Sequence, residues 1–246
     1  MSSEAYKKLC TEFYDLDKPI AHKDEVNFYF NHLKETKGKI LEPMCGSGRL
    51  SIPLLKSGVR LEGADNSIEM LNSFRKKCLE CNLQPILHQC NLLGLSLSYC
   101  FDAIIIPLGS FQLFPDRKTA LKILRILHKH LNPGGFLLLD TFIPWELITK
   151  QVISDKREVH CKDGSSIKIK SHSKANRYKQ TYIDTNIYEK IVSGKCIESE
   201  NEELLITWYY QYEMELFLEK AEFKKVVQHS PNYTSNPDGI VYQAFK

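Results

Sequence analysis

Short apolar runs alternate with amphipathic stretches over the first 142 residues, and this alternation limits the fold more than any other feature of the chain. Strand-like runs occupy 39–43, 59–65, 84–90, 101–109 and 135–142. Helical periodicity occupies 24–36, 47–57, 66–80 and 121–131. The run 101–109 is almost entirely apolar, as is typical of a strand covered on both faces. Repeated strand–helix units with short connections predict an α/β fold, with a mostly parallel sheet and helices on both faces.

The pattern changes after Pro144. Asp163-Gly164 is a hairpin-turn sequence, and 181–192 and 204–210 resemble further strands. We therefore predict an antiparallel β insertion at 145–209, serving as a substrate lid or a dimer contact. The preceding residues, 1–144, would form a cofactor-binding core with an N-terminal helical arm. Residues 210–246 would complete that core with a helix at 212–223 and two strands.

Composition narrows the class of protein. The 246 residues carry a formal net charge of +3 and eight irregularly spaced cysteines. Such a weak basic balance does not suggest a dedicated nucleic-acid surface, and the cysteine spacing favours reduced thiols over a disulfide framework. The first residues lack the apolar core of a signal peptide, and no 18-residue apolar segment predicts a membrane span. We expect a soluble cytoplasmic protein.

The stretch ILEPMCGSGRLSIPLL (40–55) joins a strand to a helix through a glycine loop. Its two close glycines lack the third of a dinucleotide loop, and the chain contains no GxxxxGK[ST] phosphate loop. Glu42 would repel a pyrophosphate and attract an amine. Asp65, seventeen residues after Gly48 and at the end of the next strand, can accept hydrogen bonds from ribose hydroxyls. A ligand with a ribose, a cationic amine and no phosphate fits this pattern, and S-adenosylmethionine is such a ligand.

At this point the chain resembles the class I S-adenosylmethionine-dependent methyltransferases. The resemblance covers about 37–142 and rests on ILEPMCGSGRL, GADNSIEML, CNLLGL, FDAIIIPLGSF and LNPGGFLLLD, in the family's order. FYDLDKP and ITWYYQYEMELFLEKAEF are similar to the small-molecule subgroup that includes aminosugar N-methyltransferases. The resemblance implies a Rossmann-like, seven-stranded sheet with a β insertion before the last helix. It also implies methyl transfer from S-adenosylmethionine to an N or O nucleophile of a small molecule, with S-adenosylhomocysteine as product.

The resemblance further implies a set of cofactor-binding residues. These are Tyr14, Glu42, Met44, Gly46, Gly48, Asp65, Asn66, Asn91, Leu92, Pro107 and Ser110. Tyr14, Glu42 and the two glycines would surround the methionine end, Asp65 would hold the ribose, and the asparagines would lie beside the adenine. Pro107 to Ser110 would line the transfer site. Met44 departs from the family pattern, because it stands where the loop usually has its first glycine.

The sequence offers few candidates for a catalytic acid or base. Methyl transfer requires mainly alignment and exclusion of water, and a base helps only when the acceptor is a hydroxyl. His22, His160 and Asp184 are candidates for such a catalytic role. The single pair Cys78-x-x-Cys81 is half of what a structural zinc site needs, so we predict no metal site.

Three other functions remain open at the sequence level. A nucleic-acid (RNA) methyltransferase is the first, although IPLGSF stands where base-amino methyltransferases carry an Asn/Asp-Pro-Pro-Tyr turn. A nicotinamide dehydrogenase is the second, and the missing third glycine opposes it. The third is a non-catalytic module that only binds the cofactor. We expect a small-molecule acceptor, no nucleic-acid or membrane partner, and a monomer or homodimer.

Overall fold

A seven-stranded sheet forms the centre of the computed structural model, which describes residues 5–231, 233 and 239–246. The strand order is β10-β11-β5-β4-β1-β2-β3. The strands are β1 (Ile40–Pro43), β2 (Leu61–Asp65), β3 (Ile86–Gln89), β4 (Phe101–Ile106), β5 (Leu131–Thr141), β10 (Lys225–His229) and β11 (Ile240–Phe245). β1 to β5 pair in parallel, whereas β11 runs antiparallel to β5 and β10.

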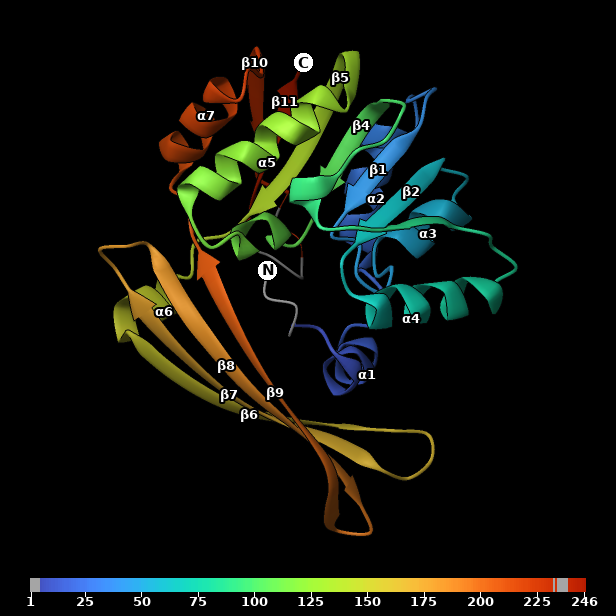
Figure 1. Cartoon of the computed structure of the whole chain (residues 1–246), viewed down its shortest axis with the longest axis vertical. Coiled ribbons are helices and arrows are strands. Elements are labelled where there is room, and N and C mark those ends of the chain that lie inside the picture. Colours follow the sequence, from blue (N-terminus) through green and yellow to red (C-terminus); the bar gives the residue numbers. More distant parts are fainter. Residues whose placement is uncertain (1–4, 232, 234–238) are drawn as a thin grey trace.

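Helices cover both faces of this sheet (Figure 1). They are α2 (Lys23–Leu33), α3 (Ser51–Lys56), α4 (Ile68–Leu79), α5 (Arg117–Lys129) and α7 (Gln211–Lys220). Ile104 and Ile106 of β4 belong to the core beneath α5 and α7, while Ala103 and Ile105 belong to the core beneath α2 and α3. A strand buried on both sides has no polar face, which explains why its sequence is almost entirely apolar. The predicted α/β, Rossmann-like fold class is confirmed.

The start of β5 differs from the sequence-based prediction. The helical stretch 121–131 and the strand-like run 135–142 predict a break at Asn132-Pro-Gly-Gly135, whose residues favour a turn. The strand instead begins at Leu131. Leu131 pairs with Phe101, and the register shifts before Phe136. The Asn132 amide donates to the Asp102 carboxylate at 2.7 Å, which anchors this irregular segment to β4. The turn-forming residues therefore lie in a distorted strand.

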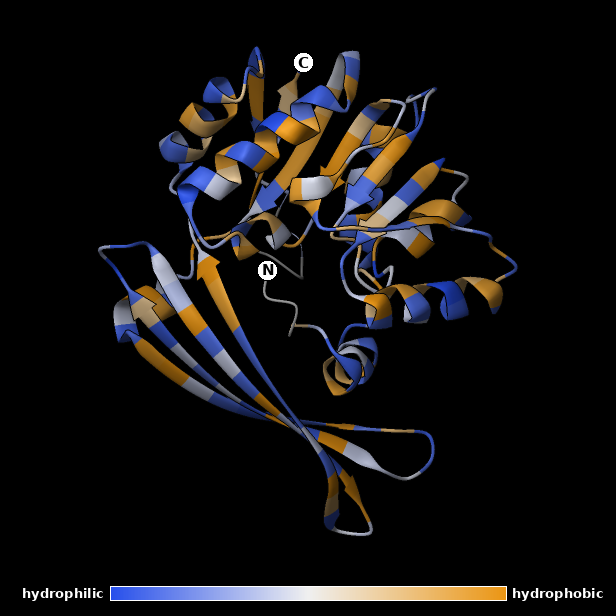
Figure 2. Cartoon of the chain, viewed as in Figure 1, coloured by the Kyte–Doolittle hydropathy of each residue, from blue (hydrophilic) through white to orange (hydrophobic). Residues whose placement is uncertain are grey.

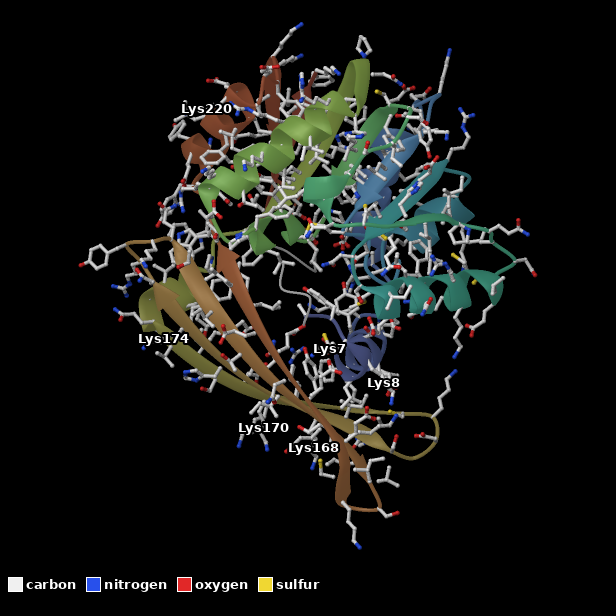
Figure 3. All side chains as sticks on the ribbon, in the orientation of Figure 1. Lys7, Lys8, Lys168, Lys170, Lys174 and Lys220 are labelled. Atoms are coloured by element: carbon white, nitrogen blue, oxygen red, sulfur yellow. The ribbon has the colours of Figure 1, made fainter. Side chains whose placement is uncertain are left out.

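The insertion forms a separate four-stranded antiparallel sheet (Figure 1). It follows the short helix α6 (Trp145–Lys150), and its strands are β6 (Val152–His160), β7 (Ser166–Asn176), β8 (Thr181–Val192) and β9 (Lys195–Thr207). Apolar and polar residues alternate along these strands (Figure 2). Lys168, Lys170 and Lys174 lie on the face of β7 turned away from the core (Figure 3). The boundaries 144 and 209 remain predictions.

Helix α1 (Lys8–Asp17) lies between the insertion sheet and the α/β core (Figure 1). Its Leu9 and Phe13 pack against Ile169 and Tyr188 of the insertion. The rings of Phe13 and Tyr188 meet edge to face, 5.7 Å apart. Arm and insertion thus share one small core. In the part of the chain that the structure describes, no helix is both long and apolar enough to cross a membrane.

Candidate functional site

A cavity of about 460 Å³ opens where the strand order reverses, between β1 and β4. In parallel α/β sheets, this crevice at the carboxyl ends of the strands is the usual ligand site. The cavity lies under the arm and the insertion. Its lining comprises Tyr6, Tyr14, Lys18, Glu42, Met44, Cys45, Gly46, Arg49, Leu50, Asp65, Met70, Pro107, Leu108, Gly109, Ser110, Leu113, Phe142, Tyr182, Asp184, Leu204 and Ile206.

The loop after β1 has the left-handed backbone conformation typical of a glycine loop, even at Met44, where a side chain is present. Met44 has φ +60°, and Gly46 and Gly48 have φ +52° and +82°. A side chain in this left-handed region strains the backbone by about 1–2 kcal/mol. A Cβ at Gly48 would also lie 2.6 Å from the Phe74 ring. Gly48 therefore serves the packing of the loop against α4, while Met44 and Gly46 line the cavity.

Two carboxyl groups face the cavity from neighbouring strand ends. Glu42 is almost fully buried and accepts a short hydrogen bond from the Ser51 hydroxyl. Burial raises the pKa of Glu42 to about 8. Asp65 accepts the backbone N–H groups of Gly46 and Ser67, each at 2.9 Å. Burial raises the pKa of Asp65 and these N–H groups oppose that rise. Its oxygens keep further lone pairs for a ligand.

Arg49 also lines the cavity, but its guanidinium already has a partner. It forms two hydrogen bonds with the buried Glu25 carboxylate, at 2.8 and 2.6 Å. Burial acts to lower the pKa of Arg49, yet the bonds to Glu25 outweigh it and raise the pKa. Burial raises the pKa of Tyr14 as well, which keeps its hydroxyl protonated. The ion pair of Arg49 and Glu25 thus holds the Arg49 side chain in place in the cavity lining.

The loop after β4 forms the next wall. Leu108 and Gly109 both have positive φ, at 54° and 67°. The N–H of Leu108 donates to the Asp140 carboxylate at 3.2 Å, and a Cβ at Gly109 would lie 2.6 Å from Phe142. This tight turn presents Pro107 to Ser110 along the cavity wall. Their role at the transfer site remains a prediction.

The insertion supplies the opposite wall through Tyr182 and Asp184 of β8 and Leu204 and Ile206 of β9. The Asp184 carboxylate accepts the Ser173 hydroxyl at 2.6 Å and the Asn186 amide at 3.4 Å. Burial, followed by the Asp184 charge, raises the pKa of Tyr182. This wall therefore combines one fixed carboxylate with apolar surface.

A smaller hollow continues from the main cavity, since Met44 and Asp65 line both. Its other lining residues are Ala64, Asn66, Cys90, Asn91, Leu92 and Phe114. The side chain of Asn91 accepts the N–H of Leu93 at 3.0 Å. The residues expected beside an adenine thus lie together, on the far side of Asp65 from Glu42.

Two of the catalytic candidates lie away from the cavity. His22 precedes α2, and His160 ends β6, where strand alternation places it opposite the inward-packed Val159. Of the three candidates only Asp184 lines the cavity. Sequence reasoning missed Tyr6, Lys18, Met70 and Tyr182, because no motif surrounds them. Only their position in the arm, on α4 and on an inward strand face identifies them.

Comparison with known proteins agrees with this geometry. Residues 40–135 match the family model described as a methyltransferase domain. This segment of the chain therefore resembles a methyltransferase domain. The predicted resemblance to S-adenosylmethionine-dependent methyltransferases is confirmed, and with it S-adenosylmethionine as the cofactor.

Three known proteins illustrate what this chain is similar to. The cypemycin N-terminal methyltransferase of a Streptomyces species is 26% identical over 57% of this chain and 58% of its own length. The putative methyltransferase YqeM of Bacillus subtilis is 32% identical over 42% of each chain. This chain therefore spans about half the length of the curated relatives it matches. The amino pentose methyltransferase CalS10 of Micromonospora echinaspora shares the fold, with a TM-score of 0.73, 16% identity and 99% coverage of both chains.

The residues of this cavity fit S-adenosylmethionine. Glu42 offers a carboxylate for its ammonium, and Asp65 offers lone pairs for ribose hydroxyls. The hollow lined by Asn66, Asn91 and Leu92 offers amide groups and an apolar surface for adenine. Among the described residues, no three His, Cys, Asp or Glu side chains are arranged to hold a metal ion.

Proposed function

We propose that this protein transfers a methyl group from S-adenosylmethionine to the nitrogen of a small-molecule amine. One observation carries the choice of acceptor: the Asp184 carboxylate lies on the cavity wall opposite the cofactor loop. A carboxylate surrounded by Tyr182, Leu204 and Ile206 suits a cationic amine on an apolar body. The names of the N-terminal methyltransferase and the amino pentose methyltransferase support the same acceptor chemistry.

Bound cofactor supplies a methyl group on a sulfonium sulfur, already primed for displacement. The chain contributes position. Asp184, held by Ser173 and Asn186, would orient the amine and draw its proton, so that the nitrogen lone pair can face the methyl group. The cofactor would supply the methyl carbon for the new C–N bond and keep the electrons of the broken C–S bond on sulfur, as a neutral thioether. Pro107 to Ser110 would keep the amine nitrogen, the methyl carbon and the sulfur in line. The arm and the insertion would exclude water from the cavity.

The cofactor is tested first, by calorimetric titration with S-adenosylhomocysteine and with NADH. We expect binding of the first ligand, no binding of NADH, and much weaker S-adenosylhomocysteine binding in Asp65→Ala. A panel of small amines and matched alcohols is then incubated with S-adenosylmethionine. Mass spectrometry should show an added CH₂ on amines. Methylation of the alcohols alone would overturn the choice of nitrogen, and cofactor binding without turnover would favour a non-catalytic module.

Asp184→Asn tests the acceptor role. We expect a higher KM for the amine and a lower kcat, with S-adenosylhomocysteine affinity unchanged. Glu203→Gln is the matched control, because Glu203 lies on the neighbouring strand, exposed and on the outer face. Equal effects of the two variants on KM would contradict a direct role of Asp184.

The proposal extends to the cellular location. All eight cysteine side chains are free thiols, as in proteins of reducing compartments. We therefore propose a cytoplasmic enzyme. Whether it is a monomer or a homodimer remains a prediction to be measured by light scattering.

A further inference from the structure

The amino-acid end of the cofactor carries two opposite charges on neighbouring groups, an ammonium and a carboxylate. Glu42 supplies the anion for the ammonium in the proposed function. Binding both charges away from water also requires a cation, and that cation must be free of an existing partner to gain from the new contact.

Three cations lie near this end of the cavity: Arg49, Arg157 and Lys18. Arg49 is held by both oxygens of Glu25. Arg157 is paired with Asp17 at 2.7 Å and with Asp155 at 3.4 Å. Lys18 lines the cavity, and no carboxylate of the described residues lies within ion-pair distance of its ammonium. Lys18 is therefore the cation that remains available for a ligand.

We propose that Lys18 binds the methionine carboxylate of the cofactor. This inference rests on the proposed function, because it assigns one residue to the same site. Lys18 directly follows α1, and Tyr14 of the same helix also lines the cavity. A bond from Lys18 to the ligand would thus tie the arm to the cofactor. Desolvation by the surrounding protein lowers the pKa of Lys18, the Asp17 charge opposes this effect, and the charges of Arg49 and Arg157 add to it. Much of the Lys18 side chain is nevertheless exposed, so it can turn toward a ligand in the cavity that it lines.

Two ligands separate this role from a merely structural one. S-adenosylhomocysteine carries the amino-acid end, whereas 5′-methylthioadenosine has the same nucleoside and a thioether but no amino-acid group. Both are titrated calorimetrically into wild type, Lys18→Met and Lys18→Arg. Lys220→Met is the control, since Lys220 lies at the end of α7, on the far side of the molecule from α1 (Figure 3).

We expect Lys18→Met to lower the affinity for S-adenosylhomocysteine by roughly tenfold or more, which is the usual effect of losing a hydrogen bond to a charged group. Its affinity for 5′-methylthioadenosine should stay at the wild-type value. Lys18→Arg should retain most of the affinity for S-adenosylhomocysteine, because it keeps the cation. Lys220→Met should bind both ligands as wild type does.

The remaining outcomes overturn the inference. Equal weakening of both ligands would show that Lys18 only shapes the arm, and unchanged binding of both would show that it contacts neither. If the wild type bound neither ligand, the proposed function would fail and the inference with it. If the wild type bound S-adenosylhomocysteine and Lys18→Met bound it equally well, only the inference about Lys18 would fail, and the proposed function would stand.

Discussion

Glu200 of β9 accepts the backbone N–H of Leu9, at 2.9 Å, across 191 positions of sequence. Its other carboxylate oxygen accepts the N–H of Cys10 at 3.1 Å. Helix α1 has no side-chain cap of its own at Lys7, so a strand of the insertion provides it. Glu202, two positions after Glu200 on β9, accepts the backbone N–H of Tyr6 at 2.9 Å. The arm and the insertion are therefore joined into one cover over the cavity.

Replacing Glu200 by Gln should loosen this cover. The variant keeps one acceptor oxygen but loses the second and the negative charge at the helix N-terminus, a change worth about 1 kcal/mol. We expect amides at 8–14 to exchange hydrogen several-fold faster, measured by mass spectrometry of peptides. S-adenosylhomocysteine affinity should fall by a similar factor, because Tyr6 and Tyr14 line the cavity.

Glu198→Gln is the control for Glu200→Gln. Glu198 lies two residues earlier on β9 and pairs with the exposed Lys8 at 3.0 Å. Exposed pairs contribute about 0–1 kcal/mol, so exchange in α1 should change little. Faster exchange of α1 in both variants alike would contradict a specific capping role for Glu200.

The elements of the fold were predictable because their patterns are local. The apolar run of β4 reflects burial on both faces of the sheet, and the stripe of α4 reflects contacts that recur every three to four residues. The start of β5 was not predictable, since the Asn132–Asp102 bond overrides the turn preference of Asn-Pro-Gly-Gly. The capping of α1 by Glu200 depends on a contact between distant segments, which no sequence window contains.

The same distinction applies to the site. Glu42 and Asp65 could be placed from sequence, because each ends a parallel strand and such ends meet at one edge of the sheet. Whether Asp184 or His160 faced the cavity depended on which side of a twisted strand is inward, and this follows from packing against α1. Lys18 became a candidate only when the ion pairs of Arg49 and Arg157 were known.

Cofactor affinity should depend on pH through Glu42. Its pKa of about 8 means that the empty site holds a protonated carboxyl group over much of the neutral range. An ammonium favours the ionised form, so binding must release this proton. We expect S-adenosylhomocysteine affinity to rise by up to about tenfold per pH unit from 6 to 8 and then to level off. Titrations at fixed salt test this. Glu42→Gln should bind more weakly and lose the pH dependence attributed to this group, and a slope equal to that of wild type would contradict the assignment.

The same group affects stability with a definite sign. Burial raises the pKa of Glu42 from 4.5 in the unfolded chain to about 8 in the folded protein. The folded state thus binds more protons between these values, and the stability contributed by this group is present at low pH and lost as pH rises to about 8. We expect the free energy of unfolding of wild type, relative to Glu42→Gln, to decrease over this range by a few kcal/mol. Urea unfolding of both proteins from pH 5 to 9 measures it, and a rising difference would show the opposite shift.

Met44 provides a test of the loop conformation. At φ +60°, replacement by Gly removes a strain of about 1–2 kcal/mol but also removes a side chain that packs on the main core and adds flexibility to the unfolded chain. These effects oppose one another, so we expect Met44→Gly to change the free energy of unfolding by less than about 1 kcal/mol. Met44→Val should be destabilising by more than this, because a β-branched residue tolerates positive φ poorly. Urea unfolding, with S-adenosylhomocysteine titration of each variant, makes the comparison. If Val were tolerated as well as Gly, residue 44 would not hold the left-handed conformation, and this account of the loop would be wrong.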